Sequence, residues 1–403
     1  MPELRFAGFA GEWEEKKLED ISLIFDGTHQ TPNYTDNGIK FLSVENIKSL
    51  DSEKYISEEE FNKNFKIYPE FNDILMTRIG SIGISNIVKT NEKLAYYVTL
   101  ALIKPFDSIN SEFLNYSISS YSVQNDIWKK TLHVAFPNKI NKNEIGKINL
   151  HTTSFLEQEK IGDLFNKIDQ LIENQEKLLD QSIAFKKSML QKMFPKKDSL
   201  VPEFRFDGFY KKWKAKKIKD FVKSLGGTSL ESEFDENGNY KVINIGSYSV
   251  NNTYIDQGLR INLNKKTKNK LLNKGDLVMV LNDKTAQANI LGRTLLIEEE
   301  DKFIFNQRSQ KLTPLENNYP LFIFYLLNND INRKNIIKIA QGNTQIYVNW
   351  SSVENIIYKL PDEEEQEKIG NFFKKLDKKI AKEEKLLDAY KMMKKSLLQK
   401  MFV

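Results

Sequence analysis

The sequence contains no cysteine, and this absence excludes several kinds of chemistry at once. The chain can form no disulfide, has no thiolate nucleophile and offers no sulfur ligand to zinc or to an iron–sulfur cluster. No apolar run reaches the roughly 18–20 residues that a membrane span needs, and the N-terminal MPELRFAGFAGEW lacks the apolar core of a signal peptide. We therefore expect a soluble protein of the reducing cytoplasm.

Marks of DNA-acting enzymes are missing as well. No G-x-x-x-x-G-K-[ST] loop occurs, so no P-loop motor is encoded, and without a Pro-Pro dipeptide the signature of amino-methylating DNA methyltransferases is absent. The acids after Pro361 resemble half of a nuclease motif, but Gln366 replaces its glutamate, and acids there favour a helix N-terminus. The three histidines all lie in the first half, which excludes a histidine role shared by both halves. We predict no catalytic residue and no metal site.

Positively charged residues are in small excess over negatively charged ones, which gives a net charge of +5. Such a balance permits nucleic-acid binding without indicating it. A length of 403 residues exceeds one ordinary domain, and 40% hydrophobic and 11% aromatic residues are enough for a core in each of two domains.

The sequence contains a tandem repeat, which defines its organisation. PELRFAGFAGEWEEKKLEDI, which begins at Pro2, returns as PEFRFDGFYKKWKAKKIKDF from Pro202. Residues 155–194 return 208 positions later with 23 of 40 residues identical, including EQEKIG, KLLD and LQKMF. Between these repeats, residues 22–150 and 222–360 share little. We therefore predict four parts: residues 1–150, 151–195, 196–360 and 361–403.

The repeated 40-residue stretch is typical of a long helix. Apolar residues step along it by threes, fours and sevens, which indicates a coiled-coil-like stripe. A second apolar column beside the first, which includes Phe165, indicates more than one neighbour. A long stripe needs a long partner, so we expect the two copies to pair antiparallel, although docking of each helix on its own domain is the alternative. The predicted pairing and spacing residues are Ile161, Leu164, Ile168, Leu171, Leu178, Ile369, Phe372, Leu376 and Leu386.

The two variable regions have mixed character. Short β-branched runs such as DILMTRIG and DLVMVLN alternate with Gly and Asn turns, and each region also holds a helical stretch. The predicted fold class is thus mixed α/β: two pseudo-symmetric globular domains joined by two long antiparallel coiled-coil helices.

Polar loops in these regions are candidates for reading DNA bases. Gln and Asn pair with adenine, Arg pairs with guanine, and either Arg or Lys binds phosphate, although each residue taken alone could be ordinary surface polarity. The candidate DNA-binding residues are Thr28, His29, Gln30, Arg78, Thr228, Ser229, Lys284, Arg293, Arg308, Gln341, Asn343 and Gln345.

The repeat plan resembles the specificity subunit of type I restriction–modification enzymes along the whole chain. The marks are P-E-[LF]-R-F-x-G-F before Trp13 and Trp213, EQEKIG at Glu157 and Glu365, and the LQKMF endings. The resemblance implies two target recognition domains, each reading half of a split site in double-stranded DNA, held apart by the helices.

The resemblance also implies partners. Two methyltransferase subunits would bind the chain and methylate adenine, and two motor-nuclease restriction subunits would join them. S-adenosylmethionine, ATP and Mg²⁺ would belong to those partners, with no cofactor in this chain. Two alternatives are a coiled-coil scaffold that does not bind DNA and a self-sufficient DNA enzyme. A scaffold does not explain why two domains diverged while their frame stayed fixed, and an enzyme would need a motif that is absent.

Overall fold

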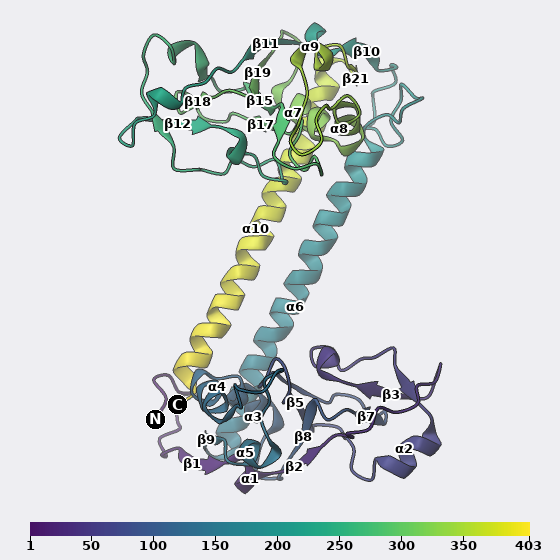
Figure 1. Ribbon diagram of the computed structural model, residues 1–403, viewed down its shortest axis with the longest axis vertical. Coiled ribbons are helices and arrows are strands. Elements are labelled where there is room, and N and C mark those ends of the chain that lie inside the picture. Colours follow the sequence, from purple (N-terminus) through teal and green to yellow (C-terminus); the bar gives the residue numbers. More distant parts are fainter. The chain divides into compact units, whose positions relative to one another are not determined.

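The computed structural model covers all 403 residues and divides into two compact units (Figure 1). Unit 1 consists of Met1–Lys177 and Glu384–Val403, and unit 2 consists of Leu178–Glu383. Both long helices, α6 (Phe155–Lys192) and α10 (Glu363–Met401), contribute residues to both units. None of the helices is long and apolar enough to cross a membrane.

Unit 1 contains a four-stranded sheet and a three-stranded sheet. The four-stranded sheet has the order β2-β8-β5-β6 and the smaller one β4-β3-β7, while β1 and β9 form a separate ribbon. The strands are β1 (Glu14–Lys17), β2 (Ser22–Asp26), β3 (Ile39–Leu42), β4 (Tyr55–Ile56), β5 (Ile74–Thr77), β6 (Ser85–Ile87), β7 (Leu94–Tyr96), β8 (Leu100–Pro105) and β9 (Asn149–Thr152). The short helices are α1 (Leu18–Ile21), α2 (Glu58–Asn64), α3 (Ser111–Ile118), α4 (Tyr121–Lys130) and α5 (Lys142–Gly146).

Unit 2 repeats this plan. Both of its sheets have four strands. The one with the longer strands, called the larger sheet as in unit 1, has the order β11-β19-β15-β17, the second has the order β13-β12-β18-β14, and the ribbons are β10-β21 and β16-β20. The strands are β10 (Lys214–Lys217), β11 (Val222–Gly226), β12 (Tyr240–Ile243), β13 (Arg260–Ile261), β14 (Leu271–Leu272), β15 (Leu277–Val280), β16 (Asn282–Asp283), β17 (Thr294–Leu296), β18 (Phe303–Phe305), β19 (Ser309–Pro314), β20 (Ile346–Tyr347) and β21 (Ile357–Leu360). The short helices are α7 (Pro320–Asn328), α8 (Asp330–Ile337) and α9 (Trp350–Val353).

The central strand of each larger sheet is buried on both faces because each face meets a different core. In β5, Ile74 and Met76 pack with residues of α3 and α4, whereas Leu75 packs with the second sheet. In β15, Met279 packs with residues of α7 and α8, whereas Val278 packs with the second sheet. Side chains alternate along a strand, so a sheet covered on both sides needs apolar residues at every position. The predicted mixed α/β class is confirmed.

The EQEKIG motif attaches the start of each long helix to its domain. In α6, the Glu157 carboxylate accepts two hydrogen bonds from the Arg5 guanidinium (2.6 and 2.7 Å), and the Gln158 side-chain oxygen accepts from the Asn110 N–H (2.9 Å). Lys160 lies over the Phe9 ring at 5.1 Å, and Ile161 is buried. The motif therefore has a packing explanation at almost every position.

The second copy of the motif makes the same contacts in unit 2. Arg205 donates two hydrogen bonds to Glu365, both of 2.7 Å, and the Tyr319 N–H donates to Gln366 (3.0 Å). Lys368 lies 4.7 Å from the centre of the Phe209 ring. Arg205 also donates to a backbone carbonyl of the N-terminal segment of its repeat, as Arg5 does in unit 1. The repeated motif thus corresponds to a repeated junction.

The glycine of EQEKIG allows the helix to approach α3 closely, which gives a stability prediction. A Cβ at Gly162 would lie 2.8 Å from the Glu112 Cβ and 3.1 Å from the Phe113 backbone nitrogen. We expect Gly162→Ala to destabilise unit 1 by about 1–3 kcal/mol, the usual cost of overpacking. Gly11→Ala is the matched control because nothing lies within 4 Å of its Cβ position. Chemical denaturation of the three proteins measures the difference, and equal midpoints would contradict the prediction.

A tyrosine, an aspartate and a lysine tie both long helices to each domain. In unit 1 the Tyr116 hydroxyl donates to Asp169 of α6 (2.8 Å), and Lys394 of α10 pairs with Asp169 at 2.5 Å. In unit 2 the Tyr325 hydroxyl donates to Asp377 of α10 (2.6 Å), and Lys186 of α6 pairs with that aspartate. Burial and the neighbouring carboxylate raise the pKa of each tyrosine, so both remain donors. The helices exchange roles between the two units.

These contacts define the direction of the helix pair. In unit 1 the first half of α6 lies against the last residues of α10, and in unit 2 the first half of α10 lies against the last residues of α6. Within each unit the two helices run in opposite directions, as Figure 1 shows. The predicted antiparallel pairing is therefore present in both.

The predicted stripe is only partly buried. Ile161, Ile168 and Ile369 are buried and Leu164, Phe372 and Leu376 half-buried, but Leu171, Leu178 and Leu386 are 45%, 41% and 38% exposed. For these three leucines the predicted burial is wrong. Near its start each helix meets both a domain and the other helix, whereas farther along it has fewer neighbours. The buried positions there include polar ones, namely Gln175, Ser182 and Glu383.

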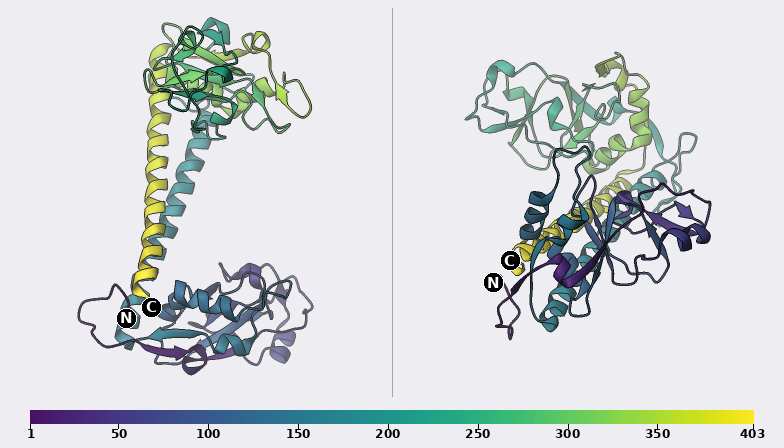
Figure 2. Two further views of the ribbon diagram at one scale, coloured as in Figure 1. Left: turned by 60° about the vertical axis from the view of Figure 1, so that its left-hand side comes forward. Right: turned by 60° about the horizontal axis from the view of Figure 1, so that its bottom comes forward.

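The two chain ends lie together in unit 1, as both figures of the fold show (Figure 2). The Leu4 N–H donates to the Lys400 carbonyl (2.8 Å), and Phe402 packs edge-on against Trp13 at 6.2 Å. In unit 2 the continuous chain makes the same contacts: the Phe204 N–H donates to Lys192 (2.9 Å), and Phe194 meets Trp213 at 6.0 Å. The gap between the termini thus corresponds to the junction at residues 195–201.

We expect a circular permutant to fold as the parent chain does. Phe402 would be joined to Pro2 through a copy of residues 195–201, and new termini would be opened at the exposed Lys197. Thermal unfolding of the permutant would be compared with that of the parent chain. A permutant that does not fold would contradict the pseudo-symmetric arrangement.

Candidate nucleic-acid interface

One end of the larger sheet gathers the candidate residues in both units. In unit 1, β2 ends beside the start of β8 (Asp26 opposite Ala101), and β5 ends at Thr77 opposite Leu100. In unit 2, Gly226 of β11 lies opposite Gln310, and Val280 of β15 lies opposite Ser309. We call this end of each sheet, with the loops that leave it, the loop edge. Every candidate DNA-binding residue lies on or beside a loop edge.

A glycine begins the first loop of each loop edge because the backbone passes too close to a neighbouring strand for a side chain. A Cβ at Gly27 would lie 2.5 Å from the Tyr97 carbonyl oxygen, and one at Gly227 would lie 2.0 Å from the Asn306 oxygen. The Thr28 N–H donates to the Tyr96 carbonyl (3.1 Å), which fixes the loop. Thr28 is half-buried, whereas His29 and Gln30 that follow are exposed. The glycine therefore positions two exposed polar side chains.

Arg78 requires a correction. Its side chain is buried, forms an ion pair with Asp26 and donates from Nε to the Ile140 carbonyl (3.2 Å). Breaking this pair would leave the buried guanidinium without its carboxylate, so Arg78 is not available to a DNA base or phosphate. Arg78 instead connects the end of β2 with the segment that follows α4. The sequence indicated that Arg78 lies near the end of a strand, but it gave no sign of the ion pair with Asp26.

In unit 2 the first loop carries a negative charge beside its candidates. Thr228 and Ser229 are exposed, and the Ser229 hydroxyl donates to Glu231. Hydrogen bonds from Ser229 first, and from the Asn306 and Gln307 amides, lower the pKa of Glu231 to about 2. The carboxylate therefore stays ionised at neutral pH. It holds the Ser229 hydroxyl, whose oxygen remains able to accept a hydrogen bond.

Three cationic candidates of unit 2 are in different situations. The side chains of Lys284 and Arg308 are exposed and make no hydrogen bond or ion pair, and Arg308 adopts a positive φ of 63°. Arg293 is half-buried and donates to the Asn289 carbonyl (2.8 Å) and to Asn252 (2.6 Å). Burial, and then the nearby Arg333, lower the pKa of Arg293 to about 10, which leaves it charged at neutral pH. Of these three candidates, Lys284 and Arg308 have side chains that are free to bind an outside anion.

The last candidate loop of unit 2 is closed by backbone pairing. Gln341 and Tyr347 exchange two backbone hydrogen bonds of 2.9 Å, and β20 at the end of the loop pairs with β16. A Cβ at Gly342 would lie 2.2 Å from the Gln345 carbonyl oxygen, so the turn requires glycine. Gln341, Asn343 and Gln345 are exposed. Their amides supply paired donor and acceptor atoms at a fixed place on the loop edge.

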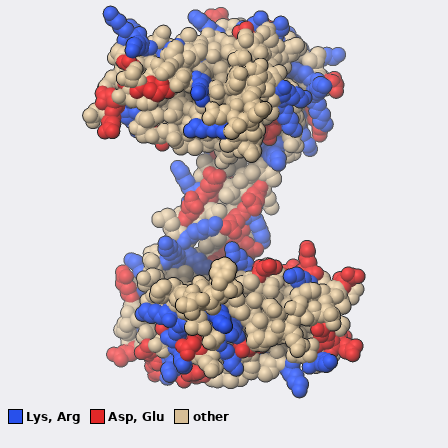
Figure 3. All heavy atoms as spheres, in the orientation of Figure 1, with Lys and Arg blue, Asp and Glu red and all other residues tan.

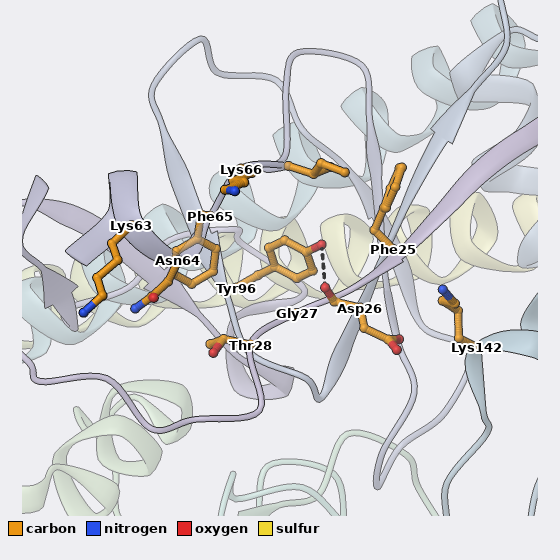
Figure 4. Close-up of a pocket in the computed structure, with 11 residues that line it drawn as sticks. Phe25, Asp26, Gly27, Thr28, Lys63, Asn64, Phe65, Lys66, Tyr96 and Lys142 are labelled. Atoms are coloured by element: carbon orange, nitrogen blue, oxygen red, sulfur yellow. Dashed lines mark hydrogen bonds between the residues drawn. The ribbon is translucent and has the colours of Figure 1, made fainter. Parts of the chain in front are cut away.

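A cavity of about 350 Å³ opens beside the first loop of unit 1 (Figure 4). Lys63, Lys66 and Lys142 lie around it, and the Tyr96 hydroxyl donates to the Asp26 carbonyl (3.1 Å) at its floor. Burial raises the pKa of Tyr96, so its hydroxyl stays protonated. The sequence interpretation missed these lysines because no repeated motif marks them: Lys63 lies in α2, Lys66 follows it, and Lys142 begins α5.

The chemistry of the loop edges is that of recognition. Exposed amides, hydroxyls and ammonium groups gather there, and the chain contains no group of three or more potential metal-ligating side chains. Asp362, part of the nuclease-like sequence, pairs with Lys211 and Lys214 at 3.1 Å each at the start of α10. On the face drawn in Figure 3, cationic and anionic side chains are interspersed over both units. Binding would therefore depend on local contacts more than on a one-signed surface.

Several known proteins are similar to this chain. A family model described as "Type I restriction modification DNA specificity domain" matches residues 210–390, which include most of unit 2. Two specificity subunits of Methanocaldococcus jannaschii are similar. The MjaVIII subunit is 27% identical over 56% of this chain and 54% of its own length, and the MjaIX subunit is 23% identical over 97% and 92%. The first match thus spans about half of that relative.

Solved structures share the fold. The type I restriction–modification S subunit from M. genitalium is 14% identical, with a TM-score of 0.64 over 100% of this chain and 99% of that one. A chain from a study of assembly and conformational transition of a type I system has a TM-score of 0.55 at 12% identity, over 96% of each chain.

These findings place a type I DNA specificity domain at residues 210–390. The chain is similar to the specificity subunits of type I restriction–modification systems, the family that the repeats resemble. The repeated motifs described above form the frame of a fold that this chain shares with such subunits.

Proposed function

We propose that each unit reads one half of a bipartite DNA sequence through its loop edge. The observation that supports this most is that two equivalent loop edges stand on matching frames but carry different exposed side chains. The loop after Gly27 offers His29 and Gln30, and the loop after Gly227 offers Ser229. Two domains that recognise different DNA sequences need the same backbone positions but different side chains at the base edges.

Phosphate contacts would position the DNA on these loops. Lys284 and Arg308 in unit 2, and Lys63, Lys66 and Lys142 in unit 1, are cations beside the loop edges. Phosphate contacts supply affinity without sequence information, and amide contacts to base edges supply specificity. Gln341, Asn343 and Gln345 are suited to adenine, whose N6 and N7 form a donor–acceptor pair.

We also propose that the chain binds two kinds of partner subunit. Two methyltransferase subunits would carry S-adenosylmethionine, and two restriction subunits would bring ATP and Mg²⁺. Exposed apolar side chains on the long helices offer them a docking surface, because large exposed apolar residues are unusual along a solvent-facing helix. These residues are Leu171, Leu178, Leu386, Met392 and Met393.

DNA binding by the complex with methyltransferase subunits tests the proposal. Methylated adenines in a host that carries the system would first identify the site. Fluorescence anisotropy would then compare the site duplex with a scrambled duplex across salt concentrations. We expect roughly 10³-fold or greater preference for the site and a linear fall of log affinity with log salt. Equal, salt-independent affinities would favour the scaffold alternative.

A further inference from the structure

The loop between Leu132 and Lys139 in unit 1 presents two apolar side chains to solvent. Phe136 is 104% exposed and Val134 is 98% exposed, more than any other large hydrophobic residue of the chain. The loop is anchored at its base: the Leu132 N–H donates to the Lys139 carbonyl (2.8 Å), and the Gly80 N–H donates to Asn138 (2.9 Å). The base is fixed, so the tip is held away from the core.

This loop is the counterpart of the Gln341–Gln345 loop in unit 2. After it, the Ile140 N–H donates to the Arg78 carbonyl (2.9 Å), and in unit 2 the Val348 N–H donates to the Leu281 carbonyl at the same distance. Arg78 and Leu281 each follow the central strand of the larger sheet. The two loops thus leave equivalent places on the two loop edges, one with an apolar tip and the other with amides.

We infer that Val134 and Phe136 read thymine by contact with its methyl group in the major groove. The inference rests on the proposed DNA-reading function and adds a specificity-determining contact to it. The C5-methyl of thymine is the apolar feature that a base edge offers in that groove, and amides suit adenine there. The loop of unit 1 would then recognise thymine by apolar contact, and the equivalent loop of unit 2 would recognise adenine by hydrogen bonds from its amides.

Thymine-to-deoxyuridine exchange tests the inference because it removes only the methyl group. The complex of the full chain with methyltransferase subunits would be titrated with duplexes that carry deoxyuridine at one thymine at a time in the unit 1 half-site. We expect one or two positions to weaken binding about threefold to tenfold. Phe136→Ala and Val134→Ser should bind the unmodified site more weakly and lose the response to deoxyuridine at those positions, as a double-mutant cycle requires.

Leu23→Ala is the matched control, since Leu23 is also an exposed apolar residue of unit 1 but lies at the other end of β2, opposite Lys104. It should keep the full response to deoxyuridine. A parent complex that binds its site specifically but ignores every deoxyuridine would overturn the inference and leave the proposed function intact. If Phe136→Ala lost subunit assembly but kept DNA binding, the tip of the loop would contact a protein partner. That result would also overturn the inference. Absence of sequence-specific binding by the parent complex would instead contradict the proposed function.

Discussion

Exchange of one variable region is expected to change one half of the methylated DNA sequence and leave the other half unchanged. The donor would be a relative with a different target, and residues 222–356 would be replaced. The exchange stops before β21, so the β10-β21 ribbon keeps its own pairing. Each mismatched base pair costs about 1–3 kcal/mol, so methylation of the original site should fall by about 30-fold to 10⁴-fold if two bases change, and further if more change.

The donor region must keep the contacts to α10 that hold the domain. Tyr325 donates to Asp377, and the Tyr319 N–H donates to Gln366. A donor with tyrosine at the position of Tyr325 is therefore required. The reciprocal exchange of residues 22–148 serves as the control and should change only the other half-site. Genome-wide mapping of methylated adenines measures both, and a change in both halves from a single exchange would show that the units do not read independently.

Matched insertions in the two long helices are expected to lengthen the spacer between the half-sites. Four residues after Gln175 in α6 and four after Asp388 in α10 would each add about 6 Å of helix. The rise of DNA is about 3.4 Å per base pair, so the spacer should grow by roughly one or two base pairs. Four residues complete slightly more than one turn, so each side chain keeps nearly the same face.

The ion pairs of the helices explain why both must be changed. Lys394 pairs with Asp169 in unit 1, and Lys186 pairs with Asp377 in unit 2, so each unit fixes the register of both helices. An insertion in one helix alone would break one register and should lower the unfolding temperature. Insertions of two residues would rotate the buried stripe by about 200° and serve as the destabilised control. A stable matched variant with the original spacer would show that the length of the helices does not set the distance between the half-sites.

The predicted helices and their antiparallel direction followed from repeats and apolar spacing, but the residues of their contact did not. Leu171 and Leu178 fit the stripe as well as Ile161 does, yet only Ile161 is buried. Its burial depends on α3 and on Phe402, which lie far from it in sequence. Periodicity gives the apolar face of a helix, whereas the number of neighbours along that face is a property of the tertiary structure.

The candidate interface was predictable only where glycines and polar clusters marked it. The loops after Gly27 and Gly227 were found in this way, and the close backbone approach explains why glycine is required there. Lys63 and Phe136 were missed because neither lies in a repeat or a polar cluster. Arg78 was misassigned because its partner Asp26 lies 52 residues away in sequence.

By itself, the sequence determined the duplicated plan, the mixed α/β class, the long helices and the resemblance to a specificity subunit, since all of these are written in local patterns and in repeats. The tertiary structure alone decided which charges are free and which loops are equivalent. The Lys284 and Arg308 side chains remain without partners while Arg78 is buried, and the Leu132–Lys139 loop matches the Gln341–Tyr347 loop without sharing its residues. The physical reason is that ion pairs and strand ends join residues that are distant in the chain, and local patterns carry no information about such contacts.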